Sequence, residues 1–194
     1  MQKITILLFL VYSTICLNAQ SKLDSLYAVW QDKTQTDSIR TNAFKNYIWD
    51  GFLFDKPNAA FTLAEELITF SESNNYPYAK GEAYNIQGVS FWLKANYLEA
   101  VNYYERSLKI REEIGDKKGI SASLYNIGNI YLRQDNYPQA LDYHKRSLKI
   151  EEDIDNIEGV ALSLGNIGVI YSHQNNYSKA LDYYERSLKI QQER

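Results

Sequence analysis

Cysteine is almost absent from this chain, which contains 194 residues and a single cysteine, Cys16. That cysteine lies in an apolar run near the N-terminus, which we predict to be removed from the mature protein. A mature chain without thiols has no disulfide, no cysteine–zinc site and no cysteine nucleophile. Packing alone must then stabilise the fold.

Proline and surplus charge are also scarce. The three prolines leave room for long helices, because a proline interrupts a helix interior. The 21 Lys and Arg residues against 24 Asp and Glu residues give a formal net charge of -3. Nucleic-acid binding requires clustered positive charge, so nucleic acid is not a predicted partner.

Long apolar runs are absent apart from residues 4–17. This run is too short to span a bilayer comfortably, follows the positive Lys3 and precedes the small residue Ala19. That layout is typical of a secretory signal peptide, which we predict over residues 1–19 with cleavage near Ala19 or Gln20. The alternative is a buried N-terminal helix. A signal peptide predicts an exported protein, periplasmic or secreted, with no membrane span in the mature chain.

A period of 40 residues organises the rest of the sequence. The octapeptide YYERSLKI occupies 103–110 and 183–190, and YHKRSLKI occupies 143–150. The period also aligns three columns of small residues: Gly88, Gly128 and Gly168; Ala100, Ala140 and Ala180; and Ser107, Ser147 and Ser187. Periods of this size indicate a solenoid.

Each repeat reads as two helices joined by a turn. In the second repeat, Leu124, Ile127 and Tyr131 recur at helical spacing. The segment RQDN at 133–136 breaks this pattern, and Pro138 suits the first turn of the next helix. The segment DIDNIEG then ends the repeat. One hairpin cannot bury its apolar faces alone, so neighbouring hairpins must stack.

The glycine column predicts that two helices approach closely. Glycine inside a helix costs about 1 kcal/mol relative to alanine, so three aligned glycines indicate a packing requirement. We expect Gly128 to face Ala140, with Ser147 as the next small contact. Phosphate binding is a poorer interpretation, because these glycines lie within helices and not in a strand-to-helix loop.

These columns resemble the tetratricopeptide repeat. That family carries an aromatic residue or Leu, then Leu-Gly, then Tyr on its first helix, and Ala, an aromatic and a small residue on its second. The matching residues are Tyr84, Gly88, Phe91, Ala100, Tyr104 and Ser107; Leu124, Ile127, Gly128, Tyr131, Ala140, His144 and Ser147; and Leu164, Gly168, Tyr171, Ala180, Tyr184 and Ser187. The resemblance implies an all-α fold, a right-handed α-solenoid of stacked antiparallel helical hairpins.

Two features depart from the usual repeat. The family repeat has about 34 residues, whereas each unit here has 40. The proline that commonly closes a repeat is replaced by Glu112 and Glu152. Both departures predict a longer second helix. The 40-residue form resembles the kinesin-light-chain-like subgroup, of the kind found in exported bacterial proteins.

The pattern persists weakly before residue 79. Phe44, Tyr47 and Ala60 fall in the columns of later repeats, and an expected turn lies at 55–58. Ile48 occupies the glycine column, so this hairpin should pack more loosely or at another angle. The predicted order is a signal peptide (1–19), an amphipathic lead-in helix (20–38), a degenerate hairpin (39–78) and three repeats (79–118, 119–158 and 159–194).

Residues that could support catalysis are few. The two histidines are His144, which stands in a core column, and His173, which should end a first helix in solvent. The acidic pairs 112–113 and 151–152 are better explained by a solvated face than by acid–base chemistry. No HExxH motif, paired cysteines or phosphate loop occurs. We therefore predict no enzyme activity, no metal and no cofactor.

A binding surface is predicted on the first helices, which line the concave side of such arrays. The candidate peptide-binding residues are Asn85, Tyr125, Asn126, Asn129, Arg133, Asn166 and His173. Asn126 and Asn166 lead this set, because a row of amides suits the backbone of an extended peptide. With equal weight, these asparagines could bond neighbouring turns within the array.

The resemblance implies a non-enzymatic scaffold that binds a peptide or protein partner on its concave face. The alternative is the N-terminal sensory portion of a bacterial signal-transduction protein, whose histidine kinase, nucleotide cyclase or DNA-binding domain is absent from this sequence. A hydrolase or small-molecule binder would need a buried charged pocket between helices. The sequence gives no sign of such a pocket.

The last segment, SLKIQQER, lies on the second helix of a repeat. Leu181 and Leu188 on this helix would normally meet the next helix pair, and an exposed apolar face predicts association. Self-association through this C-terminal helix, docking of a partner, or continuation into a longer protein would each cover the face.

Overall fold

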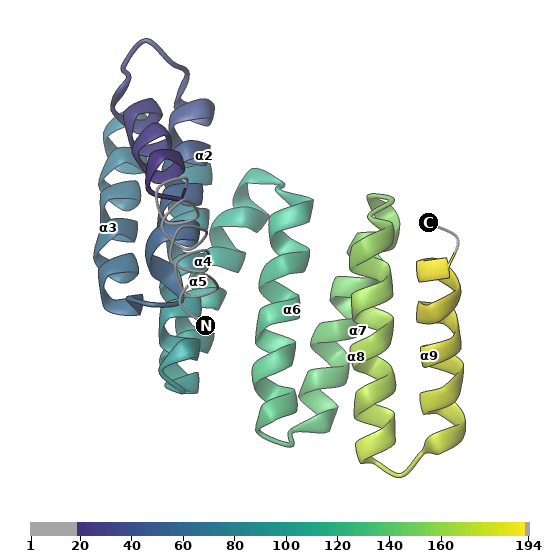
Figure 1. Cartoon of the computed structure of the whole chain (residues 1–194). Helices are drawn as coiled ribbons and strands as arrows, with labels where there is room; N and C mark the ends of the chain where they lie inside the picture. Colours follow the sequence, from purple (N-terminus) through teal and green to yellow (C-terminus); the bar gives the residue numbers. More distant parts are fainter. Residues whose placement is uncertain (1–18, 193–194) are drawn as a thin grey trace, which may run out of the picture.

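The computed structural model describes residues 19–192, and these residues form helices and short turns without any strand (Figure 1). The predicted all-α solenoid is therefore confirmed. The predicted signal peptide lies outside the described residues, apart from Ala19. Residues 19–31 form a first helix. The elements that follow are α2 (Asp37–Ile48), η1 (Trp49–Leu53), α3 (Pro57–Asn74), α4 (Pro77–Leu93), α5 (Tyr97–Ile114), α6 (Lys117–Arg133), α7 (Tyr137–Asp153), α8 (Ile157–His173) and α9 (Tyr177–Gln192).

Hairpins form between α4 and α5, α6 and α7, and α8 and α9, and the second helix of each packs against the first helix of the next. Figure 1 shows these helices following one another in chain order toward the C-terminus. The lead-in helix ends at residue 31, seven residues before the predicted boundary at 38. Asp32 ends it by accepting hydrogen bonds from Thr34, and Thr36 caps the start of α2.

The helices start two residues before the predicted repeat boundaries. Side-chain caps set this register, because Asp116 accepts from the backbone N–H of Gly119 (3.0 Å) and Asn156 from that of Gly159 (3.4 Å). Gly159 therefore lies in the first turn of α8. The sequence had suggested instead that it ends the preceding repeat. Pro138 lies in the first turn of α7, as predicted.

The repeated octapeptide supplies the contacts that close each hairpin. In the second repeat, the Tyr143 ring stacks on Tyr131, with 5.5 Å between ring centroids, and Arg146 lies over the Tyr143 ring. The Ser147 hydroxyl donates to the Ser121 carbonyl across the helix pair (3.1 Å). The equivalent contacts recur in the other repeats as Tyr103–Phe91 and Tyr183–Tyr171 stacking and as Ser107–Gly81 and Ser187–Ala161 hydrogen bonds.

The glycine column lies closest to a ring of the second helix, so His144 and not the expected Ala140 is the nearest contact of Gly128. A Cβ on Gly128 would lie 3.0–3.1 Å from atoms of the His144 ring. A Cβ on Gly88 would lie 2.6 Å from two carbons of the Tyr104 ring. The third repeat pairs Gly168 with Tyr184 in the same way. The missing side chain therefore makes room for an aromatic ring from the second helix.

The degenerate hairpin inverts this size relation. Ile48 stands in the glycine column and Ala64 in the ring column, and both are fully buried. Helix α2 makes far fewer contacts with α3 than α4 makes with α5, in line with the expected looser pairing. Immediately after Ile48 the chain continues as the π-helical turn η1, which carries Trp49 and precedes Phe54.

The final helix is covered on one side only. Leu181 and Leu188 on α9 are 58% and 53% exposed, whereas Leu148, the equivalent of Leu188 one repeat earlier, is buried under α8. The partly exposed Tyr184 lies on the same helix as these two leucines. This face has the composition of an interface between hairpins.

Candidate functional site

Hydrogen-bonded asparagines join the first helices of neighbouring repeats. Asn126 on α6 donates through Nδ2 to Oδ1 of Asn85 on α4 (3.1 Å). Asn166 on α8 donates through Nδ2 to Oδ1 of Asn129 on α6 (2.8 Å). Both amide nitrogens therefore bond within the array, which is one of the two roles considered for these asparagines. Their role in peptide binding stays a prediction.

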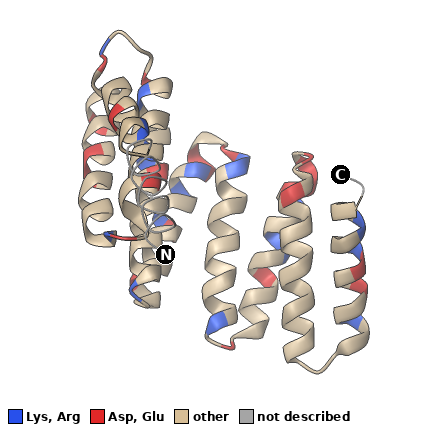
Figure 2. Ribbon diagram, in the orientation of Figure 1, with Lys and Arg blue, Asp and Glu red and all other residues tan. Residues whose placement is uncertain are grey.

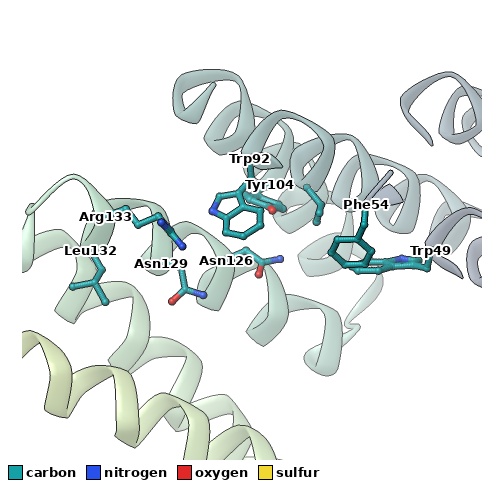
Figure 3. A pocket seen from close by; sticks show the side chains of 9 residues that line it. Trp49, Phe54, Trp92, Tyr104, Asn126, Asn129, Leu132 and Arg133 are labelled. Carbon is teal, nitrogen blue, oxygen red and sulfur yellow. The ribbon is translucent and has the colours of Figure 1, made fainter. Parts of the chain in front are cut away.

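The pairs Asn126–Asn85 and Asn166–Asn129 form an asparagine ladder along the first helices. A groove with a volume of about 500 Å³ lies beside this ladder (Figure 3). Its walls come from η1, from the first helices α4 and α6, and from one residue of α5. The lining residues are Trp49, Phe54, Val89, Trp92, Tyr104, Asn126, Asn129, Leu132 and Arg133. This volume falls within the range of about 300–1,000 Å³ that is typical of ligand pockets.

Aromatic rings and one cation dominate the groove. Phe54 is 63% exposed, and its ring centroid lies 6.1 Å from that of Trp49. On the opposite wall, the Arg133 guanidinium lies over the Trp92 ring, 5.3 Å from its centroid (Figure 3). Tyr104 is almost fully buried, and burial raises the pKa of its phenol, so this lining residue stays neutral.

The groove also offers hydrogen-bonding atoms. The ladder uses only the nitrogen of Asn126 and only the oxygen of Asn129. An asparagine side chain has both a carbonyl oxygen and an amide nitrogen, so each residue keeps one polar atom for another partner. The remaining acceptor of Asn126 and donor of Asn129 match the N–H and C=O groups of a peptide backbone.

The structure brings three of the predicted binding residues together in this groove, namely Asn126, Asn129 and Arg133. It separates the other four. Asn85 is buried in the ladder, and Asn166 lies farther along it on α8. Tyr125 packs edge-on against His144, and the exposed His173 stacks on Tyr137.

Sequence reasoning missed two aromatic residues of the groove. Trp49 stands 40 residues before Val89 and 80 before Asn129, so the same period could have identified it. Phe54 carries no such signal, because it follows the π-helical turn that interrupts the period. The aromatic wall therefore comes from the degenerate hairpin, for which the sequence predicted only looser packing.

His144 is a packed residue, as its position in the core column predicted. It is fully buried, and neither ring nitrogen has a hydrogen-bond partner among the described residues. Burial lowers the pKa of its imidazole to about 4, so the ring is neutral at pH 7.

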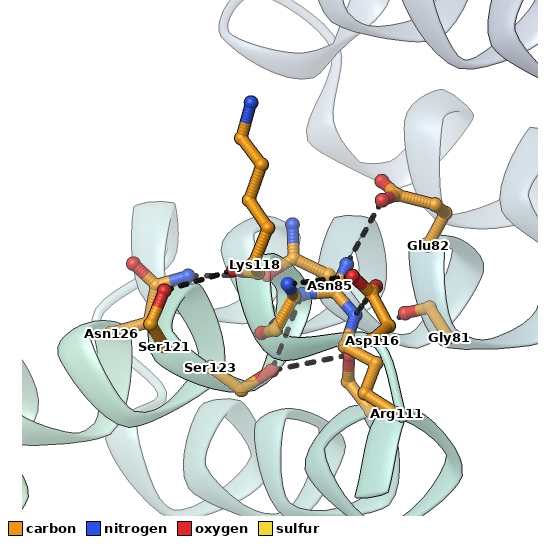
Figure 4. Close-up of polar contacts among 11 residues, drawn as sticks. Gly81, Glu82, Asn85, Arg111, Asp116, Lys118, Ser121, Ser123 and Asn126 are labelled. Carbon is orange, nitrogen blue, oxygen red and sulfur yellow. Dashed lines mark hydrogen bonds and ion pairs between the residues drawn. The ribbon is translucent and has the colours of Figure 1, made fainter. Parts of the chain in front are cut away.

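Buried charges occur at the junctions between repeats. Arg111 is 3% exposed and donates to the Gly119 carbonyl (2.7 Å) and to Glu82 (3.1 Å), with Asp116 3.9 Å away (Figure 4). Glu151 is 6% exposed, which corrects its assignment to a solvated face.

A second pocket, of about 310 Å³, lies beside Glu151 between α6, α7 and α8. Its lining includes Glu151 and Ser163, together with the charged residues Lys118 and Glu158. Nothing in the sequence had pointed to this charged pocket between helices.

Charged side chains are unevenly distributed (Figure 2). On α6 they occur only at the helix ends, and Glu158 is the single Asp, Glu, Lys or Arg of α8. Within residues 19–192, no group of three or more His, Cys, Asp or Glu side chains could hold a metal ion. No helix of this described part has the length and hydropathy of a membrane span.

Comparison with known families identifies one match. A family model described as tetratricopeptide repeat matches residues 80–153 and 121–193, which together exceed half of the chain. No curated protein sequence matches.

Solved structures share the fold at low sequence identity. BtubC (BKLC) from P. vanneervenii is 16% identical with a TM-score of 0.70, over 88% of this chain and 70% of that one. A Rap protein complexed with Competence and Sporulation Factor is 17% identical with a TM-score of 0.73, over 93% of this chain and 51% of that one. A signal transduction ATPase with a tetratricopeptide repeat sensor, from Pyrococcus horikoshii, is 20% identical with a TM-score of 0.68, over 82% and 25%. This chain thus spans about half of the Rap protein and a quarter of the ATPase.

Proposed function

This chain belongs to the tetratricopeptide repeat family, and we propose that it is a non-enzymatic scaffold that binds a peptide or protein segment. The family resemblance predicted from the 40-residue columns is confirmed by the family match. The binding site in this proposal is the groove between η1, α4 and α6.

The observation that carries the proposal is the combination of exposed rings, a stacked arginine and unused amide atoms in one groove. Tryptophan and arginine are enriched among residues that dominate binding energy at protein interfaces. Phe54 is far more exposed than a ring in a packed core and gains most from being covered. The Asn126 and Asn129 amides can then bond the backbone of the bound segment.

The partner that fits this chemistry is an extended segment with a large apolar side chain. The apolar side chain would enter between Phe54 and Trp92, and its flanking peptide groups would meet the two asparagines. The Rap protein, solved with Competence and Sporulation Factor, is an example of this fold holding a partner.

A peptide library selected on the wild-type chain tests this proposal. We expect enriched peptides to share one aromatic or large aliphatic position. Phe54→Ser should weaken their binding by about tenfold or more, since about 1.4 kcal/mol corresponds to tenfold and burial of such a side chain contributes about 1.5–3 kcal/mol. Asn126→Ala with Asn129→Ala should also weaken it.

The matched control is Leu98→Ser, because Leu98 is a highly exposed apolar residue on α5, outside the groove. It should leave peptide affinity unchanged. Equal affinity for the wild-type chain and the Phe54→Ser variant would refute the groove as the binding site.

The sensory alternative has one supporting observation, the tetratricopeptide repeat sensor of the Pyrococcus horikoshii ATPase. In that case the same groove would detect a signal for an output domain elsewhere. The genomic reading frame distinguishes the two functions: a membrane helix or output domain in the same frame favours the sensor.

We also propose export through the segment 1–19, on the strength of Lys3 and the apolar run that follows it. Mass spectrometry of the full-length gene product, expressed in a bacterium and fractionated, should find an N-terminus near residue 20 outside the cytoplasm. An intact Met1 in the cytoplasmic fraction would contradict export.

Self-association through α9 is a separate proposal, supported by the exposed Leu181, Tyr184 and Leu188. Analytical ultracentrifugation should show dimers that Leu181→Glu with Leu188→Glu converts to monomers. Leu98→Glu is the control. A wild-type monomer at high concentration would refute the proposal.

A further inference from the structure

The junction between the first two repeats contains a buried guanidinium with a full set of partners (Figure 4). Arg111 extends from α5 into the space between α4 and α6. Its Nη1 donates to the Gly119 carbonyl (2.7 Å) and to the Ser123 hydroxyl (3.4 Å), and its Nη2 donates to Glu82 (3.1 Å). The guanidinium therefore satisfies a carbonyl, a hydroxyl and a carboxylate at once.

The next junction has the same frame without the guanidinium. Forty residues on, Gly159 and Ser163 stand in the positions of Gly119 and Ser123, and Glu151 replaces Arg111. Glu82 is replaced by Ala122. A shorter side chain and an alanine leave space, which is the pocket of about 310 Å³ between α6, α7 and α8.

Two groups beside this second pocket are incompletely partnered, and Lys118 is the one basic residue in its lining. The Ser163 hydroxyl is 1% exposed and has no hydrogen-bond partner among the described residues, although its counterpart Ser123 has Arg111. The Glu151 carboxylate accepts from Ser121 and Asn156, both neutral, and no ion pair joins it to a basic side chain within residues 19–192. A buried carboxylate with only neutral partners is poorly compensated.

We propose that the pocket beside Glu151 binds a guanidinium group supplied by a ligand. Glu151 provides the opposite charge, and Ser163 and the Gly159 carbonyl accept its N–H groups, as Ser123 and Gly119 do for Arg111. A planar guanidinium carries five donors, whereas an ammonium is a compact point charge, so the pocket favours arginine over lysine.

The position of the pocket suggests where the group comes from. Tyr125 lines it, and the next residue of α6, Asn126, lines the peptide groove. An arginine in a bound segment could reach this pocket while the segment occupies the groove. This source rests on the proposed function, whereas the guanidinium site itself does not.

Calorimetric titration of the full chain with acetyl-Gly-Arg-Gly-amide tests the site. The citrulline analogue has the same shape without the charge and should bind about tenfold more weakly or worse, because charge-assisted hydrogen bonds are the strong ones. The lysine analogue should also bind more weakly. Equal binding of the arginine and citrulline peptides, or binding of neither, would overturn the proposal.

Variants locate the binding. Glu151→Gln should weaken arginine-peptide binding by about tenfold or more, whereas Glu152→Gln removes the same charge from the exposed neighbouring residue and should not. Ser163→Ala removes the unpartnered hydroxyl and should also weaken binding. A Glu152→Gln effect as large as that of Glu151→Gln would overturn the assignment.

A transplant keeps the test valid if Glu151→Gln does not fold. Ala122→Glu with Glu151→Arg recreates the Arg111–Glu82 pair in the second junction and fills the pocket from within. This variant should fold, as judged by circular dichroism, and should not bind the arginine peptide. Retained binding would place the site elsewhere and refute the proposal.

Two further measurements distinguish the guanidinium site from the groove and identify the source of the guanidinium group. Phe54→Ser should leave binding of this short peptide unchanged, so the groove and the guanidinium site can fail independently. Free L-arginine should bind no more tightly than the blocked tripeptide if the source is a peptide. Tighter binding of free arginine keeps the guanidinium site and identifies the amino acid as its ligand.

Discussion

At the residue scale, size complementarity between two columns sets the spacing of each hairpin. Glycine on the first helix lies under a ring from the second in all three regular repeats, whereas Ile48 and Ala64 exchange these sizes in the degenerate one. The volume across the helix pair is thus maintained although the individual residues differ. Close packing in protein interiors explains this, because voids and overlaps are both costly.

Glycine substitutions should therefore differ in sign with position. Gly88→Ala places a Cβ 2.6 Å from the buried Tyr104 ring and should lower the free energy of unfolding by about 1–3 kcal/mol. Gly165→Ala, also within a first helix, meets only the Ser187 hydroxyl at 3.8 Å. It should raise stability by up to about 1 kcal/mol through helix propensity. Urea denaturation of both variants measures the difference, and destabilisation by Gly165→Ala would contradict it.

Replacing His144 should stabilise the protein and change its response to pH. Phenylalanine keeps a planar ring over Gly128 and removes two unpartnered buried nitrogens, which should raise the free energy of unfolding by about 1–3 kcal/mol at pH 7.

The pH effect follows from the pKa of His144, which is about 4 in the folded chain against an ordinary value of 6.5. Between these values the unfolded state binds more protons, so the wild-type chain loses stability as the pH falls from about 6.5 toward 4. His144→Phe should lose less over this range, as thermal unfolding at several pH values can measure. The exposed His173→Phe is the control, and parallel pH profiles for the wild-type chain and His144→Phe would contradict the prediction.

At the scale of the helix and its turn, a left-handed residue follows each helix from α3 to α8. These residues recur every 20 positions, at Asn75, Ala95, Gly115, Asp135, Asp155 and Asn175, with φ between 49° and 71°. The left-handed conformation reverses the chain direction within a few residues. Because these residues recur every 20 positions, successive helices are of nearly equal length. Alanine is the poorest of these residue types for the conformation, because it has a Cβ and no polar side chain to bond locally.

Ala95→Gly should therefore stabilise the protein by about 1 kcal/mol, since glycine adopts a φ of 55° without steric cost. The same substitution has the opposite effect inside a helix: Ala28→Gly, within the helix of residues 19–31, should destabilise the protein by about 1 kcal/mol at most. Thermal unfolding compares the two. A lower melting temperature for Ala95→Gly would show that the turn is not strained.

At the scale of the whole molecule, the repeats share one register, but the side chains at the junctions between them differ. The first junction contains a buried arginine with two acidic neighbours, and the second contains a buried glutamate with neutral neighbours and a pocket. The last helix, α9, has no following hairpin within the described residues to cover Leu181 and Leu188. Stability in such arrays is a sum over repeats and their interfaces.

In the monomeric Leu181→Glu with Leu188→Glu variant, hydrogen exchange should therefore be fastest at the last described helix. We expect the amides of α9 to exchange well before those of α5 and α7, which are covered on both sides, because local opening of α9 breaks one interface instead of two. Mass-spectrometric exchange on the full chain measures this. Exchange in α9 as slow as in α7 in this monomeric variant would contradict the prediction.

Features that depend on contacts along one helix or across one hairpin could be predicted from the amino-acid sequence alone. The period of 40 predicted the helices, the turn at 133–136, the burial of His144 and the family, because neighbouring positions on a helix are set by local geometry. The turn expected at 55–58 lies slightly earlier, because α3 begins at Pro57. The period also predicted a first-helix surface that includes Asn126, Asn129 and Arg133.

The partners that these residues contact became clear only from the three-dimensional packing of the helices. The rotation and separation of two helices depend jointly on side chains from both, so the column alignment could not show that His144 and not Ala140 is the nearest contact of Gly128. The same cause hid the burial of Glu151, which occupies the position of the buried Arg111 one repeat later. It also hid the aromatic wall, because the π-helical turn moves Phe54 out of the period and into the groove.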